Sequence, residues 1–144
     1  MIRRYGETDV DALVSVWRIA SDLAHPFLSR EFQDSEAENV RSVYPQFAEI
    51  WVKELKGEVI GFVALIESEV GAIFLLPAYH GRGIGRELMD FAVARIGRVT
   101  LEVFKQNTIG RKFYDKYGFL ADGERLHEPS GHVAIRMTFK PTSV

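Results

Sequence analysis

Residues 76–86 read Leu76-Pro77-Ala78-Tyr79-His80-Gly81-Arg82-Gly83-Ile84-Gly85-Arg86. Three glycines lie here between an apolar segment typical of a strand and a segment with helical periodicity. In the helical segment, apolar residues recur at a spacing that places them on one stripe: Ile84, Leu88, Phe91, Ala92 and Ile96. The pattern predicts a tight loop that joins a strand to an amphipathic helix.

Such a loop is suited to bind an anion. The first N–H groups of a helix have no partner within the helix, and the helix dipole adds partial positive charge at that end. Glycine lets a ligand approach the backbone closely. Arg82 and Arg86 can add charge-assisted contacts. These features predict a site for a phosphate or a diphosphate.

Two common phosphate loops do not fit this spacing. A P-loop needs Lys and then Ser or Thr after its last glycine, but Gly85 is followed by Arg86 and Glu87. The dinucleotide fingerprint needs a third glycine where Arg86 stands, and no parallel β-α-β unit opens the chain.

The composition is that of a globular protein. The chain has 144 residues, of which 47% are hydrophobic and 26% charged, and we expect one domain over residues 1–144. A net charge of −2 gives no reason to expect nucleic-acid binding. The absence of cysteine excludes thiolate metal sites and fits a cytoplasmic location. The polar N-terminus and the lack of an apolar run of ~20 residues predict neither a signal peptide nor membrane insertion.

Working outward from the loop, the periodicity of apolar residues predicts the remaining elements. Strands are expected at residues 2–5, 48–55, 59–66, 70–76, 99–104, 119–126 and 132–139. Helices are expected at residues 9–23, 36–44, 84–96 and 108–117. Antiparallel hairpins precede one crossover unit, so the predicted fold class is α+β.

Polar residues and proline mark the ends of the first two helices. Thr8 or Asp9 is expected to cap the first helix. Asp34 or Ser35 is expected to cap the second, which Pro45 would stop.

The last helix is bounded by Asn107, an N-cap residue, and by Gly118, a candidate for a left-handed cap. Phe119 would make the hydrophobic contact of that cap. We expect one packed stripe along this helix, with Tyr114 lying off it: Ile109, Phe113 and Tyr117.

Two motifs resemble those of one family, the GNAT superfamily of acetyl-CoA-dependent N-acetyltransferases. Its pyrophosphate motif, Gln/Arg-x-x-Gly-x-Gly/Ala, corresponds to His80-Gly81-Arg82-Gly83-Ile84-Gly85, where only His80 departs. Its motif Asn-x-x-Ala-x-x-Phe-Tyr-x-Lys-x-Gly-Phe corresponds to residues 107–119, where only Gly110 departs. The resemblance covers most of the chain and is weakest over residues 1–55, a stretch similar to small bacterial members.

The resemblance implies a mixed, mostly antiparallel sheet of about six to seven strands flanked by about four helices. It also implies that the strand ending near Leu76 and the strand ending at Phe104 splay apart, which leaves a slot for CoA.

Acetyl-CoA is the co-substrate that the resemblance implies, and no metal is expected. Backbone groups of Phe74, Leu75 and Leu76 would bind the pantetheine arm, and one N–H would polarise the thioester carbonyl. Asn107 would cap its helix and reach the arm. The diphosphate would lie on a continuous run: His80, Gly81, Arg82, Gly83, Ile84, Gly85 and Arg86.

Acetyl transfer to an amine needs a base and, at the sulfur, a proton donor. An alkyl amine with a pKa near ~10.4 is protonated at neutral pH and must lose a proton. Glu69 is one candidate for the base, with Glu67 as its neighbouring alternative. His25 is a rival as a base or substrate contact, or it is a helix cap. Tyr114 matches the family tyrosine that protonates the departing thiolate.

The expected function is transfer of acetyl to a primary amine of a small molecule or peptide, by direct attack through a tetrahedral intermediate. Two alternatives stay open: an acyltransferase with another donor or a hydroxyl acceptor, and a non-catalytic acyl-CoA binding or sensing module. A homodimer is expected only by analogy with relatives. Neither nucleic acid nor a membrane is an expected partner.

Overall fold

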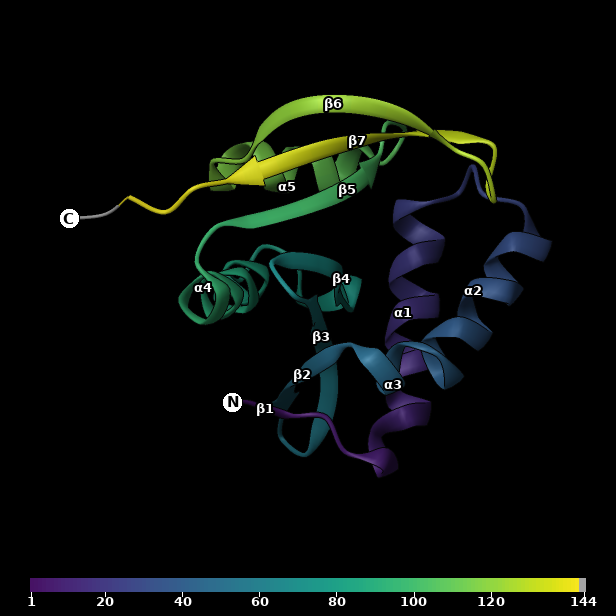
Figure 1. Ribbon diagram of the computed structural model, residues 1–144. Coiled ribbons are helices and arrows are strands. Elements are labelled where there is room, and N and C mark those ends of the chain that lie inside the picture. Colours follow the sequence, from purple (N-terminus) through teal and green to yellow (C-terminus); the bar gives the residue numbers. More distant parts are fainter. Residues whose placement is uncertain (143–144) are drawn as a thin grey trace.

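Within residues 1–142, which the computed structural model describes, seven strands form one sheet in the order β1-β2-β3-β4-β5-β7-β6 (Figure 1). The strands are β1 (Ile2–Arg4), β2 (Glu49–Leu55), β3 (Glu58–Ile66), β4 (Glu69–Leu75), β5 (Val99–Phe104), β6 (Leu120–His127) and β7 (His132–Phe139). Every neighbouring pair is antiparallel except β4 with β5. The α+β class and each expected strand are confirmed, with ends that differ by one residue or so.

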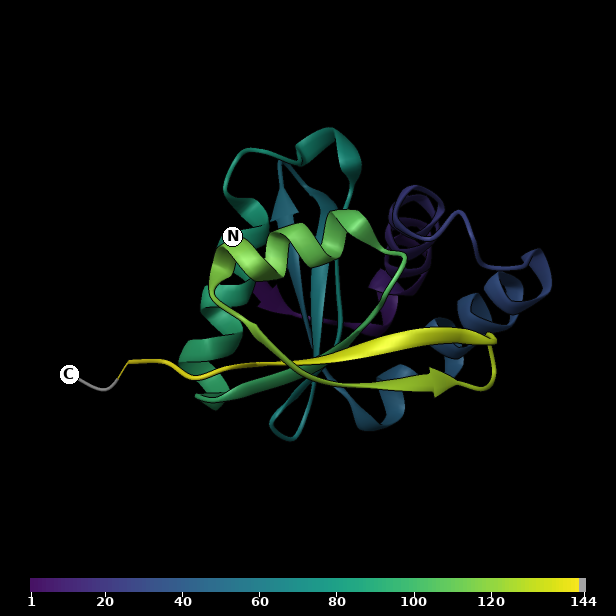
Figure 2. The ribbon, with the colours of Figure 1, turned by 90° about the horizontal axis from the view of Figure 1, so that it is seen from above.

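In the described part of the chain, four longer helices and one single helical turn flank this sheet. They are α1 (Val10–Ala24), α2 (Arg30–Ser42), the single turn α3 (Tyr44–Phe47), α4 (Ile84–Ile96) and α5 (Thr108–Tyr117), with 3-10 turns at Glu7–Asp9 and Pro77–Tyr79. α1 and α2 pack on one face of β2, β3 and β4, α4 packs on the opposite face, and α5 packs beside α4 and against β7. Figure 2 shows α4 and the pair α1–α2 on either side of β3. β3 is buried on both faces, as its apolar run predicts.

The prediction for the second helix was wrong at both ends. α2 begins at Arg30, where the Ser29 hydroxyl accepts a hydrogen bond from the Phe32 N–H at 3.1 Å. Asp34, one of the expected caps, lies inside the helix and pairs with Arg18 at 2.8 Å. Pro45 does not stop α2 but lies in the first turn of α3, where its missing N–H costs nothing.

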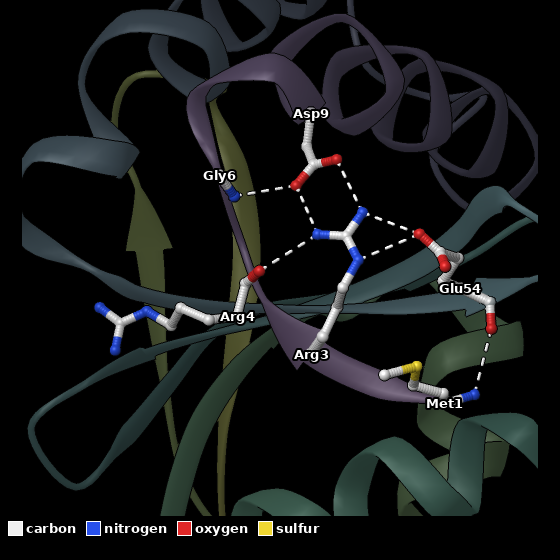
Figure 3. Close-up of polar contacts among 6 residues, drawn as sticks. All are labelled: Met1, Arg3, Arg4, Gly6, Asp9 and Glu54. Carbon is white, nitrogen blue, oxygen red and sulfur yellow. Dashed lines mark hydrogen bonds and ion pairs between the residues drawn. The ribbon is translucent and has the colours of Figure 1, made fainter.

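Hydrogen bonds and ion pairs among charged groups link β1 to the start of α1 (Figure 3). The Arg3 guanidinium donates to both oxygens of Asp9, at 2.8 and 2.9 Å, and to Glu54 Oε1 at 3.0 Å. The Gly6 N–H also donates to Asp9, at 2.8 Å. The hydrogen bonds from Arg3 lower the pKa of Asp9 below its usual value. Asp9 occupies the expected N-cap position, but its carboxylate reaches back to β1 instead of to the amides of α1.

The sheet divides between β4 and β5. Within the described residues their only register pair joins Glu69 to Thr100, and the Thr100 N–H donates to the Ser68 carbonyl at 3.2 Å. β4 continues beside β3, and β5 continues beside β7, over their full lengths. The two strands therefore separate beyond their first residues, as expected, and Figure 1 shows β5, β6 and β7 as a group apart from β4.

Candidate functional site

The edge of β4 that faces the split carries unpaired backbone groups. The Leu76 N–H donates to the Ile60 carbonyl on the β3 side at 2.9 Å. Along an antiparallel strand, the residues that bond a given neighbour alternate. Phe74 therefore turns its N–H toward β3 like Leu76, whereas Ile73 and Leu75 turn theirs into the opening beside β5.

This alternation decides which of the expected pantetheine contacts turn their backbone groups toward the split. Leu75 faces the slot, and its carbonyl oxygen lies 3.2 Å from His80 Nε2, so the imidazole ties the end of β4 to the glycine loop. Ile73 joins Leu75 on this edge and was missed at the sequence level. Counting alternate residues back from the loop would have found it, once the pairing of Leu76 with β3 was known.

The glycine loop presents a run of free amides. Gly81 and Gly83 have φ angles of +79° and +81°, a left-handed conformation that strains any residue with a Cβ. Gly83 is the N-cap of α4, and the Glu87 N–H donates to its carbonyl at 3.0 Å. Within residues 1–142, no N–H from residue 81 to residue 86 donates a hydrogen bond. These amides lie at a helix start, where they favour an anion.

The neighbours of the loop hold its shape and add positive charge. A Cβ on Gly85 would lie 3.2 Å from the Phe113 ring, so glycine lets α4 approach α5 closely. Both Arg82 and Arg86 are exposed. Their guanidinium carbons lie 5.3 Å from the Tyr79 ring and 5.2 Å from the Tyr117 ring, respectively, and these contacts position the two cations beside the loop.

Asn107 caps α5, as predicted. Its Oδ1 accepts a hydrogen bond from the Gly110 N–H at 2.8 Å. Because that bond identifies the oxygen, the amide nitrogen Nδ2 is the group that lies 3.2 Å from His25 Nε2. The helix closes at Gly118 in a left-handed conformation, which is also as predicted.

His25 is a buried, neutral histidine. Asn107 Nδ2 has no lone pair to offer, so His25 Nε2 accepts and Nδ1 carries the proton, which it donates to Ser21 Oγ at 2.9 Å. Burial lowers the pKa of His25 to about 4. Its backbone N–H caps α1 by donating to the Ser21 carbonyl. With its lone pair engaged and its pKa far below 7, the imidazole is poorly suited to be the general base at neutral pH.

Tyr114 is the buried residue of α5, and the expectation that it lies off the packed stripe was wrong. Its ring packs edge-on against Phe113 and Phe119, each with a centroid distance of 5.5 Å. Ile109, which was expected to pack, is 41% exposed. Burial raises the pKa of the Tyr114 phenol above its usual value, so the hydroxyl keeps its proton throughout the physiological range.

Glu69 lies at the other end of β4 from the glycine loop. It is exposed, at the point where β4 and β5 divide, and it borders a hollow of about 170 Å³. The other lining residues come from β5 and β7: Thr100, Leu101, Glu102 and Arg136. At about 3.3 Å per residue, β4 separates Glu69 from Leu75 by about 20 Å. Glu67 is exposed in the turn before β4.

The connection between α1 and α2, together with the first turn of α2, meets the β6–β7 hairpin. Phe27 packs against His132 with a centroid distance of 5.0 Å, and Phe32 packs against His127 at 5.8 Å.

Among residues 1–142, no group of three or more ligating side chains could hold a metal ion. No helix in that part of the chain is long and apolar enough to span a bilayer.

Comparison with known proteins agrees with this geometry. The sequence profile of an acetyltransferase (GNAT) domain matches residues 46–120. The chain is 32% identical over 120 residues to the peptidyl-lysine N-acetyltransferase YiaC of Escherichia coli K12, covering 83% of this chain and 82% of that protein. It is 33% identical over 123 residues to the peptidyl-lysine N-acetyltransferase YjaB of the same organism, covering 85% and 83%.

Solved structures share the fold. The solution structure of apo YjaB from Escherichia coli matches with a TM-score of 0.86 at 28% identity, over 96% of this chain and 95% of that one. The PaiA N-acetyltransferase of Thermoplasma acidophilum, solved in complex with coenzyme A, matches with a TM-score of 0.76 at 22% identity, over 94% and 96%. With a split sheet, a free-amide loop and these relatives, the chain belongs to the GNAT family of N-acetyltransferases.

Proposed function

We propose that the enzyme transfers the acetyl group of acetyl-CoA to the side-chain amine of a lysine in a protein or peptide. The assignment of acetyl-CoA as the acetyl donor rests on the run of unbonded amides at residues 81–86, next to the split between β4 and β5. The acceptor class is supported by the two relatives that are named peptidyl-lysine N-acetyltransferases, which cover more than four-fifths of this chain.

In the proposed complex, the diphosphate lies on the amides of residues 81–86, flanked by Arg82 and Arg86. The pantetheine arm runs back along β4 and bonds the Leu75 N–H and the backbone groups of Ile73, like a short added strand. One of these N–H groups polarises the thioester carbonyl and later stabilises the tetrahedral oxyanion. Tyr114 and Asn107, from the α5 side, lie toward the sulfur end.

The chemistry follows from these positions. The lysine ammonium loses a proton to water, which relays it toward Glu69 because that carboxylate lies too far along β4 for direct contact, and the free amine attacks the thioester carbon. A C–N bond forms, the tetrahedral intermediate collapses, and the C–S bond breaks. The Tyr114 hydroxyl donates a hydrogen bond to the thiolate as it leaves, and the amide nitrogen loses its second proton to water.

The proposal is tested by acceptor-dependent release of free CoA thiol. Purified enzyme is given acetyl-CoA and a lysine peptide, and the matched control is the same peptide with arginine in place of lysine. We expect thiol release and a mass increase of one acetyl group only with the lysine peptide. Binding of acetyl-CoA without release on any amine would instead favour a binding module, and release only with small amines would overturn the acceptor class.

A further inference from the structure

We propose that His25 sets the length of the acyl chain that the enzyme accepts, because its ring closes the opening between β4 and β5 on the α1 side. This inference rests on the proposed function, since it assumes that acyl-CoA lies in that opening. It assigns a specificity-determining role to a residue that is poorly suited to be the base.

The first observation is the position of the ring. The His25 ring packs edge-on against Phe74 of β4, with a centroid distance of 6.2 Å, and against Phe104 of β5, at 5.2 Å. These two phenylalanines stand near the ends of the strands that have separated. A single side chain from the end of α1 therefore bridges the split.

The second observation is that the ring is held on both sides. Its Nδ1–H donates to Ser21 Oγ at 2.9 Å, and its Nε2 accepts from Asn107 at 3.2 Å. The side chain is 7% exposed. Displacing the ring would break two buried hydrogen bonds and leave polar atoms unpaired, which is costly. The ring therefore forms a rigid wall, unlike a surface side chain that can swing aside.

The third observation concerns Gly110, where the family motif has alanine. A Cβ at this position would lie 2.6 Å from Asn107 Nδ2. Alanine would thus push the Asn107 amide out of the position from which it bonds His25. The absence of this Cβ allows the His25–Asn107 contact in this chain.

The consequence for specificity follows from the path of the coenzyme. An arm that bonds Leu75 and Ile73 carries its thioester past Phe74, and an acyl chain that projects from there toward α1 meets the His25 ring. Acetyl ends within this space, whereas propionyl and butyryl add one and two methylenes that need the ring to move. A difference of one methylene in a closed pocket changes kcat/KM by about tenfold or more.

The test compares kcat/KM for acetyl-, propionyl- and butyryl-CoA with one lysine peptide. For the wild type we expect acetyl-CoA to exceed butyryl-CoA by at least about tenfold. His25→Ala removes the wall, and we expect the butyryl-to-acetyl ratio to rise by about tenfold. His25→Phe keeps a ring of similar size but loses both hydrogen bonds, so we expect it to relax the preference for acetyl less than His25→Ala does. Leu23→Ala, an exposed position on the same helix, is the matched control and should leave the ratio unchanged.

A second variant covers the case in which His25→Ala does not fold. Gly110→Ala frees the His25 ring indirectly, because the added Cβ displaces the Asn107 amide. We therefore expect it to raise the butyryl-to-acetyl ratio of kcat/KM, as His25→Ala does. The proposal is overturned if the wild type uses butyryl-CoA as well as acetyl-CoA, or if a folded variant that removes or frees the ring keeps the wild-type ratio. Failure of the proposed function would look different: none of the three acyl-CoA donors would release thiol in the presence of the lysine peptide.

Discussion

At the scale of single residues, the environment of Tyr114 decides what its hydroxyl can do. A thiolate such as that of CoA has a pKa near ~8.5, as for a cysteine side chain, and an ordinary phenol has a pKa near ~10. Burial raises the phenol pKa further, so complete proton transfer from Tyr114 to the thiolate is uphill. The hydroxyl is better suited to donate a hydrogen bond that stabilises the leaving thiolate.

Replacing this hydroxyl tests that role. We expect Tyr114→Phe to lower kcat by about 100-fold, because removal of one positioned hydrogen-bond donor to a developing anion costs about 10²–10³ in rate, while the affinity for CoA changes little. Turnover is measured by thiol release and affinity by calorimetry. Equal losses of turnover and of CoA affinity would remove Tyr114 from the sulfur site.

The buried state of His25 makes a second prediction, about stability and pH. Unfolded, the imidazole titrates near 6.5, but in the folded protein its pKa is about 4. Between these values only the unfolded state binds the proton, so stability is full above pH 6.5 and falls as the pH drops toward 4. At about 1.4 kcal/mol per pKa unit, we expect a loss of about 3 kcal/mol over this range.

Urea unfolding at pH 7 and pH 4.5 measures this loss. His25→Gln carries no titrating group, so its free energy of unfolding should fall less than that of the wild type by about 2 kcal/mol. The carboxylates are common to both proteins and cancel in the comparison. Identical pH dependence in the two proteins would show that His25 is not a buried neutral group.

Sequence reasoning worked best for residues whose roles are local. Gly83 and Gly118 were identified because a helix start and a helix end each demand a backbone that glycine provides. The contact between His25 and Asn107 was not predicted, because these residues are 82 positions apart and nothing in either segment specifies the other. The burial of Tyr114 was missed because an amphipathic stripe gives only an approximate direction for each side chain.

At the scale of elements, we propose that the glycine loop and α4 form the donor site together. Gly81 and Gly83 hold left-handed conformations next to amides that donate no hydrogen bond, and Gly85 lets α4 pack on Phe113. A side chain at Gly83 would strain the backbone and change the direction of the amides. If the loop binds the diphosphate as proposed, stability and CoA affinity both depend on Gly83.

Gly83→Ala separates these effects when it is compared with Gly57→Ala. Gly57 has a φ of +82° in the β2–β3 turn, and a Cβ there also meets open space, so both variants carry a similar strain. We expect each to lose about 1–2 kcal/mol of stability, and only Gly83→Ala to lose CoA affinity, by about tenfold or more. Calorimetry with CoA and urea unfolding measure the two quantities. Unchanged CoA affinity in Gly83→Ala would argue against the loop as the diphosphate site.

The error in α2 has a physical cause at this same scale. Its only buried residues are Ala37 and Val40, and Phe32 is the one apolar residue in its first turns, so these turns carry no apolar periodicity. The Ser29 cap was therefore overlooked in favour of polar residues that lie closer to the apolar positions. Strands such as β3 and β5 were predicted well because the alternation or continuity of their apolar residues matches their burial.

At the scale of the whole molecule, the split sheet is the feature that a ligand would complete. Two half-sheets are joined through one register pair between β4 and β5, and the side chain of His25 bridges them farther along. The split was expected only from the family resemblance, since strand periodicity does not reveal which neighbours pair. A coenzyme between the strands would bind backbone groups that the protein leaves free.

Ligand binding should therefore stabilise the fold. A ligand at 100 times its dissociation constant that binds only the folded state adds about 2.7 kcal/mol. For a domain of this size we expect Tm to rise by about 5–10 °C with acetyl-CoA, and by much less with pantetheine, which lacks the diphosphate. Scanning calorimetry measures the shift. An equal rise with pantetheine would mean that the diphosphate contributes nothing.

The most direct measurement of the central claim is an amide-resolved NMR titration of the uniformly ¹⁵N-labelled protein with CoA. If the amides of residues 81–86 bind the diphosphate, their resonances show the largest shifts and saturate together with the binding isotherm. Saturable CoA binding with shifts concentrated elsewhere, and none at residues 81–86, would contradict the assignment of the donor site.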